Sequence, residues 1–409
     1  MPAEARARLR EIGVADVVVG VPSYQNEATI GHVVRTAAEG LIVHFPHLKS
    51  VIVNSDGGSS DNTRRVVANV DVPGPVEKLT MVYRGLPGKG SACRAIFDAA
   101  VQLGARACIV VDSDLRSITP QWIERLAGPL VAGDFDFVAP SYIRHKYDGT
   151  ITNNIAYPLT RALYGLRVRQ PIGGDFGVSG ALASRFARGQ VWQTDVARFG
   201  IDIWMTTTAV NEGFRICQAS LGAKVHDAKD PAASLGPMFA QVVGTLFSLM
   251  ETYEEKWLEV ESSELVPVYG AAKHLEPEPI VVTLPSMIDN FRAGATRLGR
   301  VWRKILTDQT FKRVMDCATL GYEDYVFPSD IWAKVVYDFA VGHRAWARRN
   351  KRPTEILEAL TALYFGRTAG LIIDSAQADG EQFEDLVEQQ ALMFERLKPH
   401  LVRRWKRIP

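Results

Sequence analysis

Two aspartates separated by one serine follow directly on a short apolar run. The run is ACIVV at residues 107–111, and the carboxylates belong to Asp112 and Asp114. If the extended backbone continues through them, residues two apart project from the same face of the chain. Two carboxylates that close repel each other unless a cation or protons lie between them. The pattern predicts hard oxygen ligands for Mg²⁺ or Mn²⁺, and the alternative is an aspartate that caps a turn.

The segments around this pair alternate between strand and helix patterns. Strands are expected at residues 16–21, 50–55, 79–83, 107–111 and 134–142, and helices at residues 27–39, 91–103 and 120–130. Such alternation implies an α/β fold, with a mostly parallel sheet and helices on both faces. Sheets of this kind bind ligands at the carboxyl ends of their strands. Asp112 and Asp114 fall at that position.

The second half of the sequence has a different pattern. Apolar residues recur there at helical spacing, which predicts amphipathic helices at residues 286–305, 330–348, 353–375 and 383–405. We therefore predict two domains, an α/β domain at residues 1–235 and an all-helical region at residues 236–409. The aromatic residues of segment 327–346 fit a core or a dimer interface, and we expect a homodimer.

Composition excludes several classes of function. With 47 basic and 46 acidic residues, the net charge of +1 gives no general attraction to nucleic acid. No apolar run approaches the roughly 20 residues that span a bilayer, and no strongly basic surface helix is evident. The four cysteines form no CxxC pair, so neither a zinc site nor a disulfide framework is indicated. We expect a soluble, cytoplasmic protein.

Three further polar loops come from the same half of the chain as the aspartate pair. In VPSYQNEATI (21–30), polar side chains at a helix start could contact a nucleobase or a ribose. In NSDGGSSDNT (54–63), Asp56 could accept a hydrogen bond from a base, or simply belong to a glycine turn. In RGLPGKGSACRAI (84–96), the glycines would expose backbone amides, and Lys89 could neutralise a diphosphate.

In this order, the four motifs resemble those of GT-A glycosyltransferases of the broad family 2-like type. The resemblance covers roughly residues 14–260 and is greatest to retaining glucosyl- and mannosyl-glycerate synthases, including members that use 3-phosphoglycerate. It implies a nucleotide-sugar-binding catalytic domain, a UDP- or GDP-sugar donor and a small hydroxy-acid acceptor. It also implies that the helical region completes the acceptor site or mediates oligomerisation.

The resemblance assigns roles to individual residues. Asp114 would bind the metal, Asp112 the metal or the ribose, and His226 in GAKVHDAKD would be the third metal ligand. The residues implied to bind the nucleotide sugar are Pro22, Tyr24, Glu27, Asp56, Gly88, Lys89, Asp112, Ser113, Asp114, Gly173 and Gly174.

Two more segments match the family's pattern around the transferred sugar. QPIGGDFGVSG (170–180) resembles its P-L-G-G-E segment, with Asp175 in place of glutamate. Asp202 stands at a helix start near the expected donor sugar, where it could also simply favour the helix dipole. We therefore expect Asp202, Asp175 and Lys89 to be catalytic.

The acceptor site is implied in the same way. Lys146, Thr152, Gly173 and Gly174 are expected to bind the acceptor, with Thr152 standing six residues before a proline as in the family.

The leading hypothesis is a retaining, metal-dependent transferase that moves glucose or mannose to D-glycerate, 3-phosphoglycerate or a related acid. An alternative is an inverting transferase acting on a saccharide or a lipid-linked acceptor. The absence of a membrane span and of a basic surface helix counts against the lipid version. A third possibility, from another class, is a non-catalytic sugar-nucleotide-binding protein.

Overall fold

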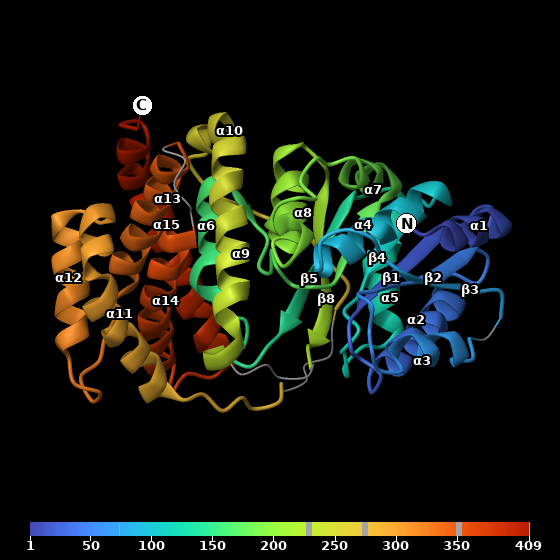
Figure 1. Ribbon diagram of the computed structural model, residues 1–409, viewed down its shortest axis with the longest axis horizontal. Coiled ribbons are helices and arrows are strands. Elements are labelled where there is room, and N and C mark those ends of the chain that lie inside the picture. Colours follow the sequence, from blue (N-terminus) through green and yellow to red (C-terminus); the bar gives the residue numbers. More distant parts are fainter. Residues whose placement is uncertain (73, 226–230, 272–276, 349–353, 409) are drawn as a thin grey trace. The chain divides into compact units, whose positions relative to one another are not determined.

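The structure is a computed structural model that describes residues 1–72, 74–225, 231–271, 277–348 and 354–408 (Figure 1). The described residues fall into two compact units. The first comprises residues 1–143, 168–228 and 266–278, and the second comprises residues 144–167, 229–265 and 279–409. Each unit is made of three separate segments of the chain. The division into units does not test the predicted domain boundary near residue 235, which stays a prediction.

The first unit contains an eight-stranded sheet in the order β10-β8-β5-β7-β4-β1-β2-β3. Its strands are β1 (Val17–Ser23), β2 (Ser50–Asp56), β3 (Glu77–Val82), β4 (Ala107–Val110), β5 (Phe137–Ile143), β7 (Phe176–Ser179), β8 (Ile216–Ala223) and β10 (Val268–Tyr269). Only β7 runs antiparallel to its neighbours, β4 and β5, in this described sheet. The expected mostly parallel sheet is confirmed.

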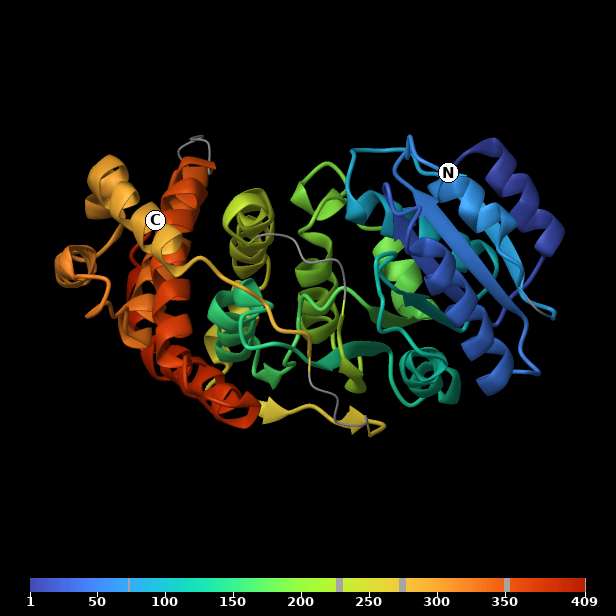
Figure 2. The ribbon, with the colours of Figure 1, turned by 90° about the horizontal axis from the view of Figure 1, so that it is seen from below.

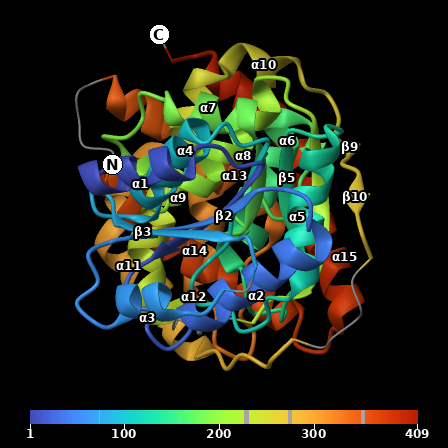
Figure 3. The same cartoon turned by 90° about the vertical axis from the view of Figure 1, so that its right-hand side faces the viewer.

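Helices cover both faces of this sheet (Figure 3). They are α1 (Ala3–Ile12), α2 (Ile30–His44), α3 (Thr63–Asn69), α4 (Lys89–Gln102), α5 (Pro120–Ala132), α7 (Gly180–Ala187), the 3₁₀ turn η2 (Asp195–Ala197) and α8 (Ile201–Asn211). Helices α2 and α5 pack on one face, and α4 contacts β1, β2 and β4 from the other.

Alternation along β1 explains the two faces, because successive side chains of a strand point to opposite sides. Val17 and Val19 belong to the core cluster that contains residues of α2 and α5, such as Val33 and Trp122. Gly20 faces α4, where an added Cβ would lie 2.3 Å from the side chain of Ile96. The glycine thus allows α4 to pack closely on the sheet.

The second unit is mainly helical, as expected (Figures 1 and 2). It contains the π-helical turn η1 (Thr152–Ala156), α6 (Tyr157–Tyr164), α9 (Pro231–Thr252), α10 (Glu254–Glu259), α11 (Leu284–Ile305), α12 (Asp308–Thr319), α13 (Ser329–Ala347), α14 (Thr354–Asp374) and α15 (Gly380–Trp405). The short strands β6 (Leu166–Arg167) and β9 (Glu264–Leu265) pair in parallel.

Helix α14 is long and apolar enough to cross a membrane, which the sequence analysis did not anticipate. However, 78% of its apolar window is buried inside the protein. Tyr364 at its middle stacks on Phe239 with ring centroids 4.4 Å apart. The helix therefore has the surroundings of a core helix of the second unit.

Candidate active site

Parallel strands end side by side at one edge of the first unit's sheet. Ser23 at the end of β1 pairs in register with Asp56 at the end of β2, and Gly20 of β1 pairs with Val110 at the end of β4. Asp112 follows two residues later. The expectation that the aspartate pair lies at the carboxyl edge of the sheet is therefore confirmed.

The carboxylate of Asp112 lies between two lysine ammonium groups. Its Oδ1 accepts a hydrogen bond from Lys89 Nζ at 2.7 Å, and its Oδ2 accepts one from Lys224 Nζ at 2.9 Å. Burial alone would raise the pKa of Asp112, but Lys224 and Lys89 outweigh burial and hold that pKa well below its usual range. Asp112 is therefore an anion whose two oxygens both have cationic partners.

Lys224 was not identified from the sequence, although it stands two residues before the predicted ligand His226. Its side chain is 4% exposed. Besides Asp112, its ammonium donates to Asp175 Oδ2 at 2.8 Å and to the carbonyl of Gly173 at 2.9 Å. Lys224 directly follows strand β8, and a charged residue at the end of a strand is also the pattern from which Asp112 was predicted.

Asp175 is fully buried, and both of its oxygens have partners. Oδ1 accepts a hydrogen bond from the backbone N–H of Asp112 at 2.7 Å, while Oδ2 accepts hydrogen bonds from Tyr142 and Lys224. Asp175 thereby ties the backbone at Asp112 to the Lys224 ammonium. These contacts make it a positioning residue, and a catalytic role of its own stays a prediction.

Lys89 joins Asp112 to a third carboxylate, Asp202. Its Nζ lies 3.5 Å from Asp202 Oδ1 and donates to the carbonyl of Gly174 at 3.1 Å. Burial alone would lower the pKa of Lys89, but Asp112 and Asp202 raise it well above its usual value. Burial raises the pKa of Asp202 against the opposing effect of Lys89.

Asp202 has an oxygen available for a ligand. It lies in the first turn of α8 and is 8% exposed. Its Oδ1 is buried and accepts no hydrogen bond from any described residue. A buried acceptor without a donor is costly, so this oxygen is suited to a hydroxyl group of a bound substrate.

Two adjacent glycines let the backbone pass close to this cluster. Gly174 has φ of +96°, and an added Cβ would lie 2.3 Å from Asp112 Oδ2. At Gly173, an added Cβ would lie 2.2 Å from the ring of Pro140. The glycine pair therefore permits its two carbonyls to accept the lysine hydrogen bonds.

Asp56 holds its own loop together. Its Oδ1 accepts hydrogen bonds from the amides of Gly58 at 2.9 Å and Ser59 at 2.7 Å, and its Oδ2 accepts them from the hydroxyls of Ser23 at 2.8 Å and Ser59 at 2.7 Å. The residue is completely buried. These bonds match the glycine-turn alternative, and contact with a nucleobase stays a prediction.

The loop after β1 has a fixed conformation. Gln25 has φ of +55°, which costs a non-glycine residue about 1 kcal/mol or more. The Gln25 N–H donates to Ser59 Oγ at 2.9 Å, and Glu27 Oε2 accepts a hydrogen bond from the N–H of Asn62 at 2.8 Å. Beside them the Tyr24 side chain is 60% exposed. Strained loops are common at binding sites, and Tyr24 offers an exposed ring for a base.

Ser113 connects the aspartate pair to this loop. Its hydroxyl donates to Asn26 Oδ1 at 2.8 Å, and its carbonyl accepts a hydrogen bond from Thr29 Oγ1 at 2.9 Å. Pro22 is buried within β1, and Asp114 is half-buried. The loops after β1 and β4 are thus held side by side.

The GKG segment differs from the expectation that its glycines expose amides. The N–H of Gly88 donates to Tyr83 Oη at 2.9 Å, and that of Gly90 donates to the carbonyl of Arg198 at 3.1 Å. An added Cβ on Gly90 would lie 1.8 Å from the carbonyl oxygen of Val196. These glycines allow close packing against η2. Within the GKG triplet, Lys89 is the residue whose side chain belongs to the lysine and aspartate cluster.

Comparison with known proteins matches part of the chain to a family. Residues 18–190 match the family model described as "Glycosyl transferase family 2". The chain is a glycosyltransferase, and its match to family 2 is confined to residues 18–190 of 409. That segment contains Lys89, Asp112 and Asp175, while Asp202 and Lys224 follow it in the sequence.

Six curated relatives of this glycosyltransferase are named "Glucosyl-3-phosphoglycerate synthase". That of Mycolicibacterium paratuberculosis is 28% identical over 257 residues, which are 57% of this chain and 71% of the relative. That of Petrotoga mobilis is 22% identical over 312 residues, which are 69% of this chain and 91% of the relative.

Among solved structures, the glucosyl-3-phosphoglycerate synthase of Mycobacterium tuberculosis with Mn²⁺, UDP and glucosyl-3-phosphoglycerate aligns at 24% identity with a TM-score of 0.45. The alignment covers 61% of this chain and 85% of that one. A global likeness of this size does not establish a shared fold, so the fold of the glycosyltransferase rests on its own sheet.

The predicted acceptor residues Lys146 and Thr152 lie in the second unit. Lys146 Nζ donates to the carbonyls of Ser375 at 2.8 Å, Ala376 at 2.9 Å and Ala378 at 2.9 Å, just beyond the end of α14. Its three N–H groups are thereby used in the protein. Thr152 is buried at the first position of η1, and acceptor binding by either residue stays a prediction.

The predicted metal ligands are only partly described. His226 lies outside the described residues, and within the described part of the chain no group of three or more His, Cys, Asp or Glu is placed to hold a metal. Both oxygens of Asp112 already accept bonds from lysines. Asp114 offers a hard oxygen ligand that suits Mg²⁺ or Mn²⁺, and further ligands would come from His226 or from a diphosphate.

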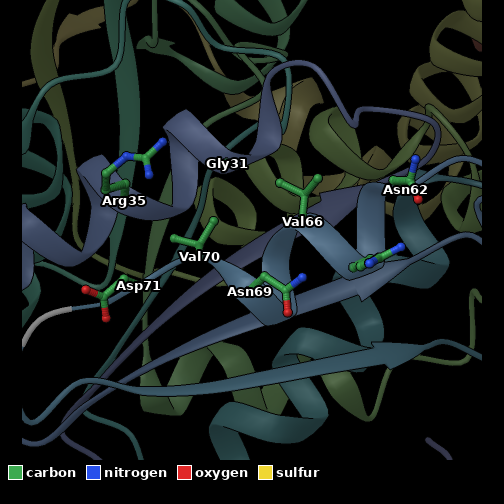
Figure 4. A pocket seen from close by; sticks show the side chains of 8 residues that line it. Gly31, Arg35, Asn62, Val66, Asn69, Val70 and Asp71 are labelled. Carbon is green, nitrogen blue, oxygen red and sulfur yellow. The ribbon is translucent and has the colours of Figure 1, made fainter.

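A surface hollow of about 710 Å³ lies elsewhere on the first unit, between α2 and α3 (Figure 4). It is lined by Gly31, Arg35, Asn62, Arg65, Val66, Asn69, Val70 and Asp71. None of the predicted site residues lines it. The lysine and aspartate cluster is the candidate active site, because its ammonium groups lie at the carboxyl edge of the sheet, where a diphosphate could meet them.

Proposed function

We propose that the protein transfers a hexose, glucose in the first instance, from UDP- or GDP-glucose to 3-phosphoglycerate, D-glycerate or a related small hydroxy acid. The observation that supports transfer from a diphosphate donor is the pair of ammonium groups, Lys89 and Lys224, held on one carboxylate at the carboxyl edge of the sheet. The choice of glucose and of the acceptor is supported by the names of the curated relatives.

The leaving group of such a donor is a nucleoside diphosphate, on which negative charge develops as the glycosidic bond breaks. Lys89 is a preorganised cation that could meet this charge, and such groups stabilise a transition state without reorganisation. The three N–H groups of Lys224 are used by Asp112, Asp175 and Gly173, so Lys224 would add a fixed positive charge nearby. Mg²⁺ or Mn²⁺ at Asp114, when bound, would supply further positive charge to the diphosphate oxygens. Asp175 keeps Lys224 in place for this task.

The sugar becomes positively charged as the leaving group departs. Asp202 is our candidate to stabilise it, because its buried Oδ1 accepts no hydrogen bond from the described residues, although it forms an ion pair with Lys89 Nζ at 3.5 Å. Asp175 is fully buried and fully hydrogen-bonded, so it is poorly suited to act as the general base that inversion requires. We therefore propose retention, with the departing phosphate oxygen accepting the acceptor's proton on the same face of the sugar.

A panel assay tests the proposal. The purified protein is incubated with Mn²⁺ or Mg²⁺, with UDP-glucose, GDP-glucose or GDP-mannose, and with D-glycerate or 3-phosphoglycerate, and release of the nucleoside diphosphate is measured. We expect acceptor-dependent release, and an anomeric NMR signal of the product with the configuration of the donor. Release that does not depend on any hydroxy acid would contradict the proposed acceptor class, and an inverted signal would favour the saccharide or lipid-linked alternative.

A further inference from the structure

Exposed basic side chains gather at one end of the second unit, on α11 and at the end of α15. Seven exposed lysines and arginines make up what we call the basic face: Arg297, Arg300, Arg303, Lys304, Arg403, Lys406 and Arg407.

The two groups of the basic face adjoin. Residues three and four apart lie on the same side of a helix, so Arg297, Arg300 and Lys304 form a stripe about 10 Å long on α11. The Nη2 of Arg404 in α15 donates to the carbonyl of Ile305 at 2.9 Å, which joins the last residue of α11 to the end of α15. Both helices belong to the same bundle (Figure 1).

The sequence segregates charge at this place. Residues 292–304 and 396–407 contain eleven lysines and arginines and no aspartate or glutamate. Because the whole chain has 47 basic and 46 acidic residues, the remainder carries 36 basic against 46 acidic. The net charge of +1 conceals this distribution. The expectation that no surface helix is strongly basic is therefore wrong.

Favourable interaction with helix dipoles accounts for only part of this pattern. Basic residues in a last helical turn are stabilised by the dipole, and the effect falls off within that turn. Arg297 and Arg300 lie one to two turns before the end of α11. In the described part of the chain, no side chain of the basic face forms an ion pair with a carboxylate. The like charges repel one another, and a bound polyanion would relieve that repulsion.

We propose that the basic face binds anionic lipid headgroups at a membrane surface. Each lysine or arginine near an anionic bilayer strengthens binding by about fivefold. Single-stranded nucleic acid would need exposed aromatic rings for stacking, and none of the exposed large apolar or aromatic side chains of the described residues lies on α11 or α15. The contact would be peripheral, because the apolar helix α14 is packed in the core.

The test measures co-sedimentation of the full chain with vesicles, without any transfer reaction. Vesicles of phosphatidylcholine alone are compared with an equal mixture of phosphatidylcholine and phosphatidylglycerol, at low and near-physiological ionic strength. The variant Arg297→Glu/Arg300→Glu reverses two charges of the basic face. Its matched control, Arg35→Glu/Arg65→Glu, reverses two exposed arginines, one on α2 and one on α3, for the same change in net charge.

We expect the wild type and the control to bind the anionic vesicles alike, with binding that weakens as salt rises. The basic-face variant should bind at least tenfold more weakly, with unchanged circular dichroism. Lack of binding to anionic vesicles at low ionic strength, equal binding to neutral ones, or an equal loss in both variants would overturn the proposal. Tighter binding to DNA or RNA than to the anionic vesicles would overturn it in favour of a nucleic-acid partner.

Discussion

Replacing Asp175 by asparagine removes one charge from the centre of the active-site cluster and keeps the shape of the side chain. The amide would present an NH₂ group to Lys224 and Tyr142 where the carboxylate now accepts their hydrogen bonds. Breaking a buried ion pair costs about 3–5 kcal/mol. We expect the lower end, about 3 kcal/mol of unfolding free energy, because Lys224 keeps its bonds to Asp112 and Gly173.

A double-mutant cycle isolates the pair. Lys224→Met alone leaves Asp175 without its cation, whereas Asp175→Asn/Lys224→Met removes both charges, so the double variant should lose about 2 kcal/mol less than the sum of the single ones. The matched control is Glu212→Gln, the same chemical change in a pair with Arg185 whose side chains are 41% and 26% exposed. It should cost less than about 1 kcal/mol.

Because a chain with two units need not unfold in one step, the measurement is hydrogen exchange of amides in β1, β4 and β7, whose slow opening reports the stability of the first unit's sheet. Additivity within about 0.5 kcal/mol would refute the coupling between Asp175 and Lys224. An Asp175→Asn variant as stable as Glu212→Gln would refute the buried network itself.

Four further predictions concern single residues. Lys89→Ala should lower kcat with the nucleotide-sugar donor by roughly 100-fold with little change in acceptor KM; unchanged steady-state kinetics would remove Lys89 from the site. Asp114→Ala and His226→Ala should each abolish metal-dependent turnover and weaken Mn²⁺ binding measured by electron paramagnetic resonance; full activity of both in EDTA would contradict the metal assignment. Gly174→Ala should lower turnover by more than roughly tenfold, because Gly174 has φ of +96° and the new Cβ would lie 2.3 Å from Asp112 Oδ2; wild-type kinetics would show that the neighbouring side chains can move to accommodate the added methyl group. Burial lowers the pKa of His343 to about 4, so the folded state binds fewer protons than the unfolded one below the ordinary value of 6.5, and stability of the second unit should fall by about 3 kcal/mol as the pH drops from 6.5 to 4; the opening free energy from hydrogen exchange of α13 amides should depend less on pH in His343→Phe, and an unchanged dependence would contradict this.

The elements of the sheet were predictable because their residues carry the signal locally. The β-branched run that became β1 and the apolar run that became β4 each have the composition of a buried parallel strand. Strand β7 was missed because its four residues, Phe176–Ser179, include a glycine and follow a glycine-rich turn. Its place between β4 and β5 depends on long-range pairing, which no local pattern reveals.

The candidate site was predictable in position and less so in its partners. Asp112 was expected from its place at a strand end, but its pairing with Lys224 joins residues 112 positions apart. Lys146 was expected to bind the acceptor substrate because it is a cation in a loop. Its hydrogen bonds to three backbone carbonyls after α14 could not be predicted from the residues next to it in the sequence. Residue type indicates what chemistry is possible, and the fold decides which partner a side chain contacts.

The most direct test of the active-site assignment is a crystal structure of the protein with Mn²⁺ and a nucleoside diphosphate sugar. We predict that the diphosphate lies within ion-pair distance of Lys89, with the metal on Asp114 and the sugar facing Asp202. A nucleotide bound elsewhere, for example in the hollow between α2 and α3, with the bonds of Lys89 and Lys224 to Asp112 unchanged, would contradict the account.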